Sequence, residues 1–390
     1  MKNRLYSILL ALVLCLSLLP AVPAKAADRV VNVYNWGQYI SDGSDGYIDV
    51  NAAFEEATGI HVNYMTFDSN ESMFTKLKTG GSSYDVIIPS DYMVARLIDE
   101  GMLLPLDFDN IPNYQYIDEA YKNTAYDPEN LYSVPYTWGT MGVIYNSAYV
   151  DEADVGSWDL LWNQKYAGKI LQYDNPRDAF GVAELLLGYS LNTRDEAELR
   201  AATDKLLEQK PLVQSYVMDQ IYDKMERGEA YIAPYYAGDF LMMQEENEDL
   251  RYYFPKEGFN LFIDAMCIPT CCSDKEAAEM YINFLCAPEI CAQNLEYLGY
   301  SVPESEAKQY MDPESVESEV AYPDEEILSR GEAYYYLDTE TTQLMDSLWL
   351  EVKTDGGMGM GPVIGIAVVA LAIGGFLFYR MSKSKKRRHS

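Results

Sequence analysis

The chain has 390 residues, and its 61 acidic and 29 basic side chains give a formal net charge of −32 at pH 7. This charge disfavours nucleic acids and anionic membrane surfaces as partners, and it attracts cationic ligands. It also serves solubility, so the charge permits a cationic ligand without requiring one. Only two histidines occur, and H-E-x-x-H, P-loop and G-x-G-x-x-G motifs are absent. We therefore expect no enzyme, no cofactor and no metal site, although paired carboxylates would also suit a glycosidase.

The first 26 residues are typical of a secretory signal peptide. Lys2 and Arg4 precede an apolar run over residues 5–21, and small residues follow at Ala24 and Ala26. This order of charged, apolar and small residues predicts export and cleavage near Ala26.

Strand and helix patterns alternate from residue 30 onwards. Expected strands cover residues 30–36, 61–67, 84–89, 141–146 and 170–173. Expected helices cover residues 52–59, 195–208 and 217–227 and pass through Leu160 and Leu161. A capping box from Asp68 to Glu71 predicts one further helix start. Strands that alternate with helices indicate an α/β fold with a largely parallel sheet.

The segment between the two ends of the chain is long enough for two lobes. It holds roughly 325 residues, which exceeds what one compact core usually accommodates. Because no long Gly/Ser or Pro-rich linker divides it, we expect a hinge made of strands. Ligands then bind in the cleft between the lobes.

Asp264 is the only charged residue in the apolar run 260–269, which reads as a buried strand. A carboxylate in such a strand is unfavourable unless it is paired. Either an Arg or Lys from elsewhere pairs with it, or the ammonium group of a ligand does. The 34 tyrosines and five tryptophans fit a ligand of methylenes and ammonium groups, because aromatic faces attract both. Most of these aromatic residues are nevertheless expected to fill cores.

The cysteines that remain after cleavage gather in one short region. They are Cys267, Cys271, Cys272, Cys286 and Cys291. Their odd number leaves at least one unpaired, and their spacing is not that of a zinc site. We expect small buried apolar residues, with one disulfide as an open alternative.

The C-terminal end is typical of a membrane anchor. Residues 362–379 carry no charge, and a basic stretch follows over residues 380–390. Eighteen apolar residues can just cross the hydrocarbon core, and a basic flank marks the cytoplasmic side. We therefore expect a linker over 353–361, a transmembrane helix over 362–379 and a cytoplasmic tail. A buried core helix is the alternative, but it would need an amphipathic stripe.

Several segments between Val30 and Leu350, taken in order, resemble the periplasmic spermidine/putrescine-binding proteins of polyamine ABC importers, an extracellular solute-binding protein family. The resemblance rests on the strand that holds Asp264 and on the segments YNWGQY (34–39), SNESM (69–73), YDVIIPSDY (84–92), YSVPYTWG (132–139) and LGY (298–300).

This resemblance implies a two-lobed fold with crossing hinge strands and a ligand pocket between the lobes. One lobe would hold residues 30–140 and 264–310, and the other 141–263 and 311–352. Asp264 would be the central carboxylate for an amine, and Ser90 a polar contact. The aromatic walls would be Trp36, Tyr39, Tyr92 and Tyr300.

Five further positions that the resemblance places at the ligand depart from the usual family pattern. They are Asn175, Asp178, Tyr236, Phe262 and Tyr334. Asn175 stands where the family often has an acid, which weakens the case for three ammonium contacts. Spermidine is the first expectation and putrescine follows closely.

The implied partners are the polyamine, a membrane permease and its ATPase. A different cationic or polar solute, or a membrane-tethered sensor with the same fold, remains an alternative.

Overall fold

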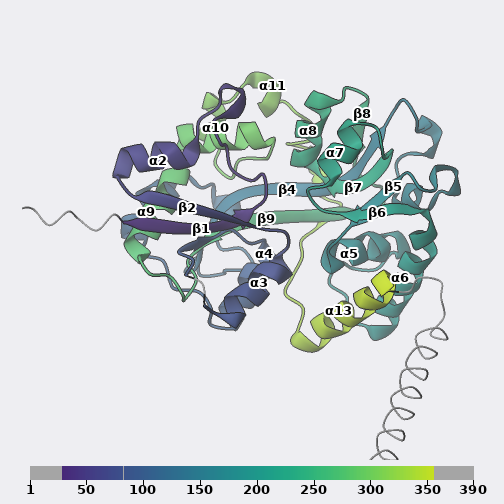
Figure 1. Cartoon of the computed structure of the whole chain (residues 1–390), viewed down its shortest axis with the longest axis horizontal. Helices are drawn as coiled ribbons and strands as arrows, with labels where there is room; N and C mark the ends of the chain where they lie inside the picture. Colours follow the sequence, from purple (N-terminus) through teal and green to yellow (C-terminus); the bar gives the residue numbers. More distant parts are fainter. Residues whose placement is uncertain (1–28, 82, 355–390) are drawn as a thin grey trace, which may run out of the picture.

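The computed structural model of the chain describes residues 29–81 and 83–354 (Figure 1). The predicted signal peptide, transmembrane helix and basic tail, and nearly all of the predicted linker, lie outside these residues. Among the helices within them, none combines the length and apolar character that a membrane span requires.

Within the described residues, one mixed sheet runs through the molecule in the order β2-β1-β3-β9-β4-β7-β5-β6, with β8 beside β4 and β10 beside β9. The strands are β1 (Val30–Trp36), β2 (His61–Phe67), β3 (Val86–Ile87), β4 (Ser133–Asn146), β5 (Ile170–Tyr173), β6 (Val213–Val217), β7 (Ile232–Tyr236), β8 (Leu250–Tyr253), β9 (Phe259–Cys267) and β10 (Gly331–Glu332).

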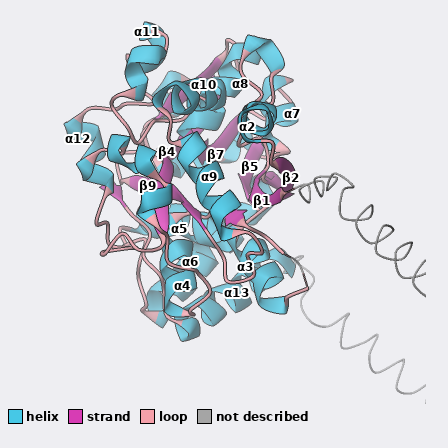
Figure 2. Cartoon of the chain, turned by 90° about the vertical axis from the view of Figure 1, so that its left-hand side faces the viewer, coloured by secondary structure: helices cyan, strands magenta, loops and turns pink. Residues whose placement is uncertain are grey.

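Helices cover both faces of this sheet, as two perpendicular views show (Figures 1 and 2). They are α2 (Val50–Thr58), α3 (Asn70–Thr79), α4 (Asp91–Asp99), α5 (Pro176–Leu187), α6 (Glu196–Gln209), α7 (Ile221–Glu226), α8 (Ala237–Glu246), α9 (Lys275–Leu285), α10 (Pro288–Leu298), α11 (Pro313–Val316), α12 (Glu325–Leu328) and α13 (Thr339–Thr354). Covered faces explain why β4 is buried along its whole length.

The prediction of a largely parallel sheet is correct for the outer strands and wrong at the centre. β1 pairs in parallel with β2 and β3, and β5 pairs in parallel with β6 and β7. β4 and β9 are antiparallel to each other, and each is antiparallel to its other neighbour in the strand order. The reason is that the chain crosses the molecule in one direction along β4 and returns along β9.

Two predicted helices need correction. The helix expected from an Asp68 capping box begins at Asn70, because Ser69 is the N-cap residue and its box partner is Ser72. The helix expected over residues 217–227 is confined to α7, because Val217 still belongs to β6. Leu160 and Leu161 lie in a short 3-10 helix over Trp158–Trp162.

The molecule has two lobes joined by β4 and β9, which run across its middle (Figure 1). Ser133, at one end of β4, pairs with Cys267 of β9, whereas residues 141–145 of the same strand pair with β7. The hydrophobic cores separate accordingly. Buried apolar residues from 31–136 and 262–311 pack in one lobe, and those from 141–259 and 334–352 in the other. β4 and β9 are therefore the strands that the two cores share.

The five cysteines of the described residues are free thiols. Cys267, Cys286 and Cys291 are buried, whereas Cys271 and Cys272 are partly exposed. Three of them thus match the prediction of small buried apolar residues, and the open alternative of a disulfide is not realised.

Candidate functional site

A pocket between the two lobes brings together every residue that the sequence placed at the ligand. It encloses about 670 Å³, including the part that opens to solvent, a size suited to a small molecule. The residues with predicted roles that line it are Trp36, Tyr39, Ser90, Tyr92, Asn175, Asp178, Tyr236, Phe262, Asp264, Tyr300 and Tyr334. Their contact with a ligand remains a prediction.

Phe262 and Asp264 reach the pocket because they are two residues apart on β9, and alternate side chains of a strand share a face. Ile263 between them faces away and lines a different cavity. Trp36 is the last residue of β1, and Tyr39 lies in the loop that follows it.

Three helices begin at this pocket. Ser90 precedes α4, Asn175 is the N-cap residue of α5, and Tyr236 precedes α8. The Asn175 side chain accepts a hydrogen bond of 2.9 Å from the backbone N–H of Asp178. Because helix N-termini carry partial positive charge, they stabilise carboxylates in their first turns. Asp178 and Asp239 occupy such positions in α5 and α8.

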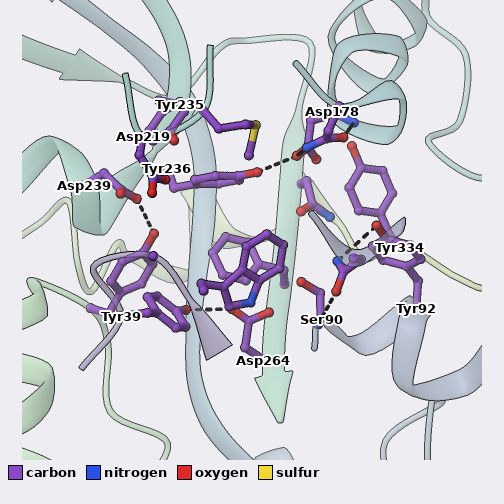
Figure 3. A pocket seen from close by; sticks show the side chains of 18 of the residues that line it. Tyr39, Ser90, Tyr92, Asp178, Asp219, Tyr235, Tyr236, Asp239, Asp264 and Tyr334 are labelled. Atoms are coloured by element: carbon purple, nitrogen blue, oxygen red, sulfur yellow. Dashed lines mark hydrogen bonds between the residues drawn. The ribbon is translucent and has the colours of Figure 1, made fainter. Parts of the chain in front are cut away.

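Asp264 lies at the centre of the pocket with only part of its hydrogen-bonding capacity used. It is 4% exposed, and the Tyr39 hydroxyl donates to its Oδ2 at 2.7 Å (Figure 3). Oδ1 is buried and makes no hydrogen bond of good geometry within the described residues, although the nearby Ser90 hydroxyl partly offsets the rise that burial causes in the Asp264 pKa. Among residues 29–81 and 83–354, no Arg or Lys forms a salt bridge with it. The first alternative considered for Asp264, a basic residue of the chain, is therefore excluded for this part of the molecule.

A second pair of carboxylates, Asp178 and Glu71, lies toward α5 and α3, and we call this pair the Asp178–Glu71 station. Tyr236 and Asn175 both donate hydrogen bonds to Oδ2 of Asp178. Nearby, the Tyr92 hydroxyl donates to Oε1 of Glu71 at 2.9 Å, and Oε2 of Glu71 is buried without a partner. This end of the pocket thus has an acceptor oxygen that nothing in the described residues satisfies.

A third group of carboxylates, Asp239 and Asp219, lies toward α8, on the other side of Asp264 in Figure 3. We call it the Asp239–Asp219 station. The Tyr300 hydroxyl donates to Asp239 Oδ2, and the Tyr222 hydroxyl donates to Oδ1 at 2.7 Å. Asp219 approaches from the same lobe so closely that a Cβ atom at Gly37 would lie 2.2 Å from its Oδ2. Gly37 therefore lets the two lobes meet at this point.

The electrostatic character of the pocket is strongly acidic. Its carboxylates are Glu71, Asp178, Asp219, Asp239 and Asp264, and its lining includes no Lys, Arg or His. Burial raises the pKa of Asp264 and of Asp239 to about 6, and it also raises the pKa of the other three. Because burial disfavours the ionised carboxylates, a cation in the pocket would favour their charged form.

Aromatic rings also line the pocket, and they pack edge to face against one another. Tyr39 and Tyr300 lie 5.2 Å apart at 84°, and Tyr236 and Phe262 lie 5.5 Å apart at 76°. Trp36 contributes a ring whose Nε1 is buried without a hydrogen-bond partner. Such walls can cover methylene groups and attract ammonium groups at their faces.

Sequence reasoning missed Glu71, Asp219 and Asp239 as lining residues. Glu71 stood inside one of the resembling segments, and Asp239 comes three residues after Tyr236, so both had a usable signal. Asp219 had none, because it lies in a mixed segment predicted as part of a helix over residues 217–227, and only the fold brings it against Gly37. In the described part of the chain, no group of three His, Cys, Asp or Glu side chains is placed to hold a metal ion.

Comparisons with known proteins agree on one family. The model of the bacterial extracellular solute-binding proteins matches residues 50–323. A spermidine/putrescine-binding periplasmic protein of Salmonella typhimurium is 34% identical over 311 residues, which covers 79% of this chain and 88% of that protein. A putrescine-binding periplasmic protein, SpuD, of Pseudomonas aeruginosa is 31% identical and covers 91% of this chain and 100% of its own length.

A solved structure extends this likeness to the fold. The substrate-binding protein PotD of a spermidine/putrescine ABC transporter from Streptococcus pneumoniae has 39% sequence identity and a TM-score of 0.70, and the match covers 83% of this chain and 98% of that one. Both the fold and the sequence thus place the chain among bacterial extracellular solute-binding proteins, and it is a member of that family.

Proposed function

We propose that the chain is the extracytoplasmic substrate-binding component of a polyamine ABC importer. The observation that carries this proposal is the buried Asp264, whose Oδ1 has no partner in a pocket that contains carboxylates and aromatic rings but no basic side chain. A protonated amine supplies the missing charge and hydrogen bond, and a charge-assisted bond of this kind is among the strong ones.

The pocket favours a ligand with several ammonium groups. Asp264 would bind the central amine, while the Asp178–Glu71 station and the Asp239–Asp219 station would each bind an end of the ligand. The aromatic walls formed by Trp36 and its neighbours would cover the methylenes. Three stations suit the triamine spermidine better than the diamine putrescine, which would engage only two of them. Spermidine therefore remains the first choice, even though Asn175 replaces an acid.

The two lobes would close around this ligand by bending at β4 and β9. We assign residues 30–140 and 264–310 to one lobe and 141–263 and 311–352 to the other. The separation of the hydrophobic cores supports this division except near its boundaries, because Phe262, Met311 and Tyr322 pack with the first lobe. The closed form would then dock on a membrane permease driven by an ATPase. No covalent chemistry takes place on the chain.

A panel of candidate ligands tests the proposal. Spermidine and putrescine are expected to raise the melting temperature of the purified protein, because a ligand that binds only the folded state stabilises it by mass action. Neutral sugars and amino acids serve as controls and are expected to leave it unchanged. If another solute raises the melting temperature and both polyamines do not, the ligand assignment is wrong.

We further propose that residues 362–379 anchor the protein in the membrane with the binding domain outside and residues 380–390 in the cytoplasm. The support is the uncharged segment and its basic flank. After cell fractionation the full chain is expected in the membrane fraction, and a chain that ends at residue 354 is expected to be released. Equal recovery of both in the soluble fraction would contradict the anchor.

A further inference from the structure

Arg177 is a buried cation directly behind one wall of the ligand pocket. Its side chain is on α5, next to Asp178, and the residue is 5% exposed. The guanidinium carbon lies 4.4 Å from the ring centroid of Tyr334 and 5.7 Å from that of Tyr92. Both tyrosines line the ligand pocket, whereas Arg177 does not. The two rings thus lie between the guanidinium and the ligand pocket.

No contact ion pair neutralises this charge within the described residues. Nη2 donates to Asn192 Oδ1 at 2.9 Å and to the Tyr335 carbonyl at 3.2 Å, while Nε and Nη1 are buried without partners. Glu184 lies on the same helix, but both of its carboxyl oxygens are also buried and unpartnered. The charges of Glu184 and Asp178 and the Tyr334 ring compensate Arg177 only through space. A buried cation without a contact ion pair is unfavourable for folding, so Arg177 calls for an explanation beyond packing.

A second, smaller cavity adjoins this wall. Its lining includes Glu71 and Tyr92, which also line the ligand pocket, together with Arg177 and Asp346. Arg96 lines it as well, but its Nε is paired with Glu100 at 3.4 Å and its guanidinium carbon is 3.7 Å from the Phe74 ring centroid. Arg177 therefore lines the cavity that shares Glu71 and Tyr92 with the ligand pocket.

We propose that Arg177 determines selectivity by setting the greatest length of polyamine that the pocket accepts, an inference that rests on the proposed polyamine function. The proposed function places a triamine between the Asp239 and Asp178 stations. A tetraamine has one ammonium group more, and extending past Tyr92 would bring that group toward the guanidinium. Repulsion between like charges at short range in a partly desolvated site disfavours this arrangement. Arg177 acts through its charge and touches no ligand atom.

The test compares spermidine with the tetraamine spermine by isothermal titration. The wild-type protein is expected to bind spermidine more tightly than spermine by about tenfold or more, which corresponds to about 1.4 kcal/mol. Arg177→Met, and Arg177→Gln as a second neutral variant, are expected to lose most of this preference. Arg177→Lys keeps the charge and is expected to keep the preference.

Glu184→Gln tests the charge argument from the other side, because Glu184 is buried on the same helix, lines neither cavity and carries a charge that opposes that of Arg177. Without that opposing charge, the preference is expected to be kept or to increase. A loss of selectivity in Glu184→Gln as large as in Arg177→Met would show a packing effect and overturn the inference. Wild-type protein that binds spermine as tightly as spermidine would also overturn it, whether or not the Arg177 variants fold. If the wild type binds no polyamine, the proposed function fails and the inference fails with it.

Discussion

Replacing Asp264 by Asn is expected to weaken spermidine binding by about a hundredfold at pH 7.5, which corresponds to about 2.8 kcal/mol. The amide has nearly the shape of the carboxylate, and its oxygen can still accept the hydrogen bond from the Tyr39 hydroxyl. What the variant loses is the charge that faces the ligand at the unpartnered Oδ1. Leaving a buried ammonium group without its counter-charge is strongly unfavourable. Isothermal titration of the two proteins measures the difference.

Stability measurements separate this effect from misfolding. Since Asp264 is buried with no basic partner in the described residues, its replacement by a neutral amide is expected to leave the melting temperature of the ligand-free protein unchanged or higher. Asp159→Asn removes the same formal charge from an exposed position outside the pocket and serves as the control. Wild-type affinity in Asp264→Asn would show that the ligand's charge is balanced elsewhere.

Acidification from pH 7.5 to pH 5 is expected to weaken spermidine binding by roughly a hundredfold as well. Asp264 and Asp239 have pKa values of about 6 in the free protein, so at pH 5 each is ionised in only about one molecule in ten. The polyamine keeps its protons over this range and binds the ionised carboxylates. Binding therefore strengthens as the pH rises through 6, and it releases protons from the protein near that pH.

The stability of the ligand-free protein changes with pH in the opposite direction to the affinity for spermidine. For a carboxyl group whose pKa is raised by folding, its favourable contribution to folding is present at low pH and is lost as the pH rises through about 6. The stabilisation that spermidine gives should grow over the same interval. Titrations in two buffers of different ionisation enthalpy measure the proton release directly. An affinity that is equal at pH 5 and pH 7.5 would contradict the assignment of these carboxylates as ligand contacts.

Local patterns predicted much of the fold, and their failures have physical causes. Gly59 ends α2 in the left-handed conformation, with φ of 72°, as expected of a glycine that follows a helix. The start of α3 was displaced by one residue because Asp68 and Ser69 are both good N-cap residues, and only the backbone geometry selects Ser69. The antiparallel centre of the sheet could not be read from single strands, because strand direction follows from how the chain crosses between lobes.

The site residues that lie in segments resembling the solute-binding family could be predicted from the sequence. Phe262 and Asp264 share a face of β9, as the alternation of the strand requires. Asp219 was not predictable, because it reaches the pocket only by tertiary packing against Gly37. The same holds for the position of Arg177 behind Tyr92 and Tyr334, since nothing in its sequence neighbourhood indicates which rings it will face.

Isothermal titration of the wild-type protein with spermidine and with putrescine at pH 7.5 tests the central claim most directly. The account predicts saturable binding of one polyamine per chain, tighter for spermidine than for putrescine, with the affinity lost in Asp264→Asn and retained in Asp159→Asn. The absence of binding of either polyamine to correctly folded protein would contradict it.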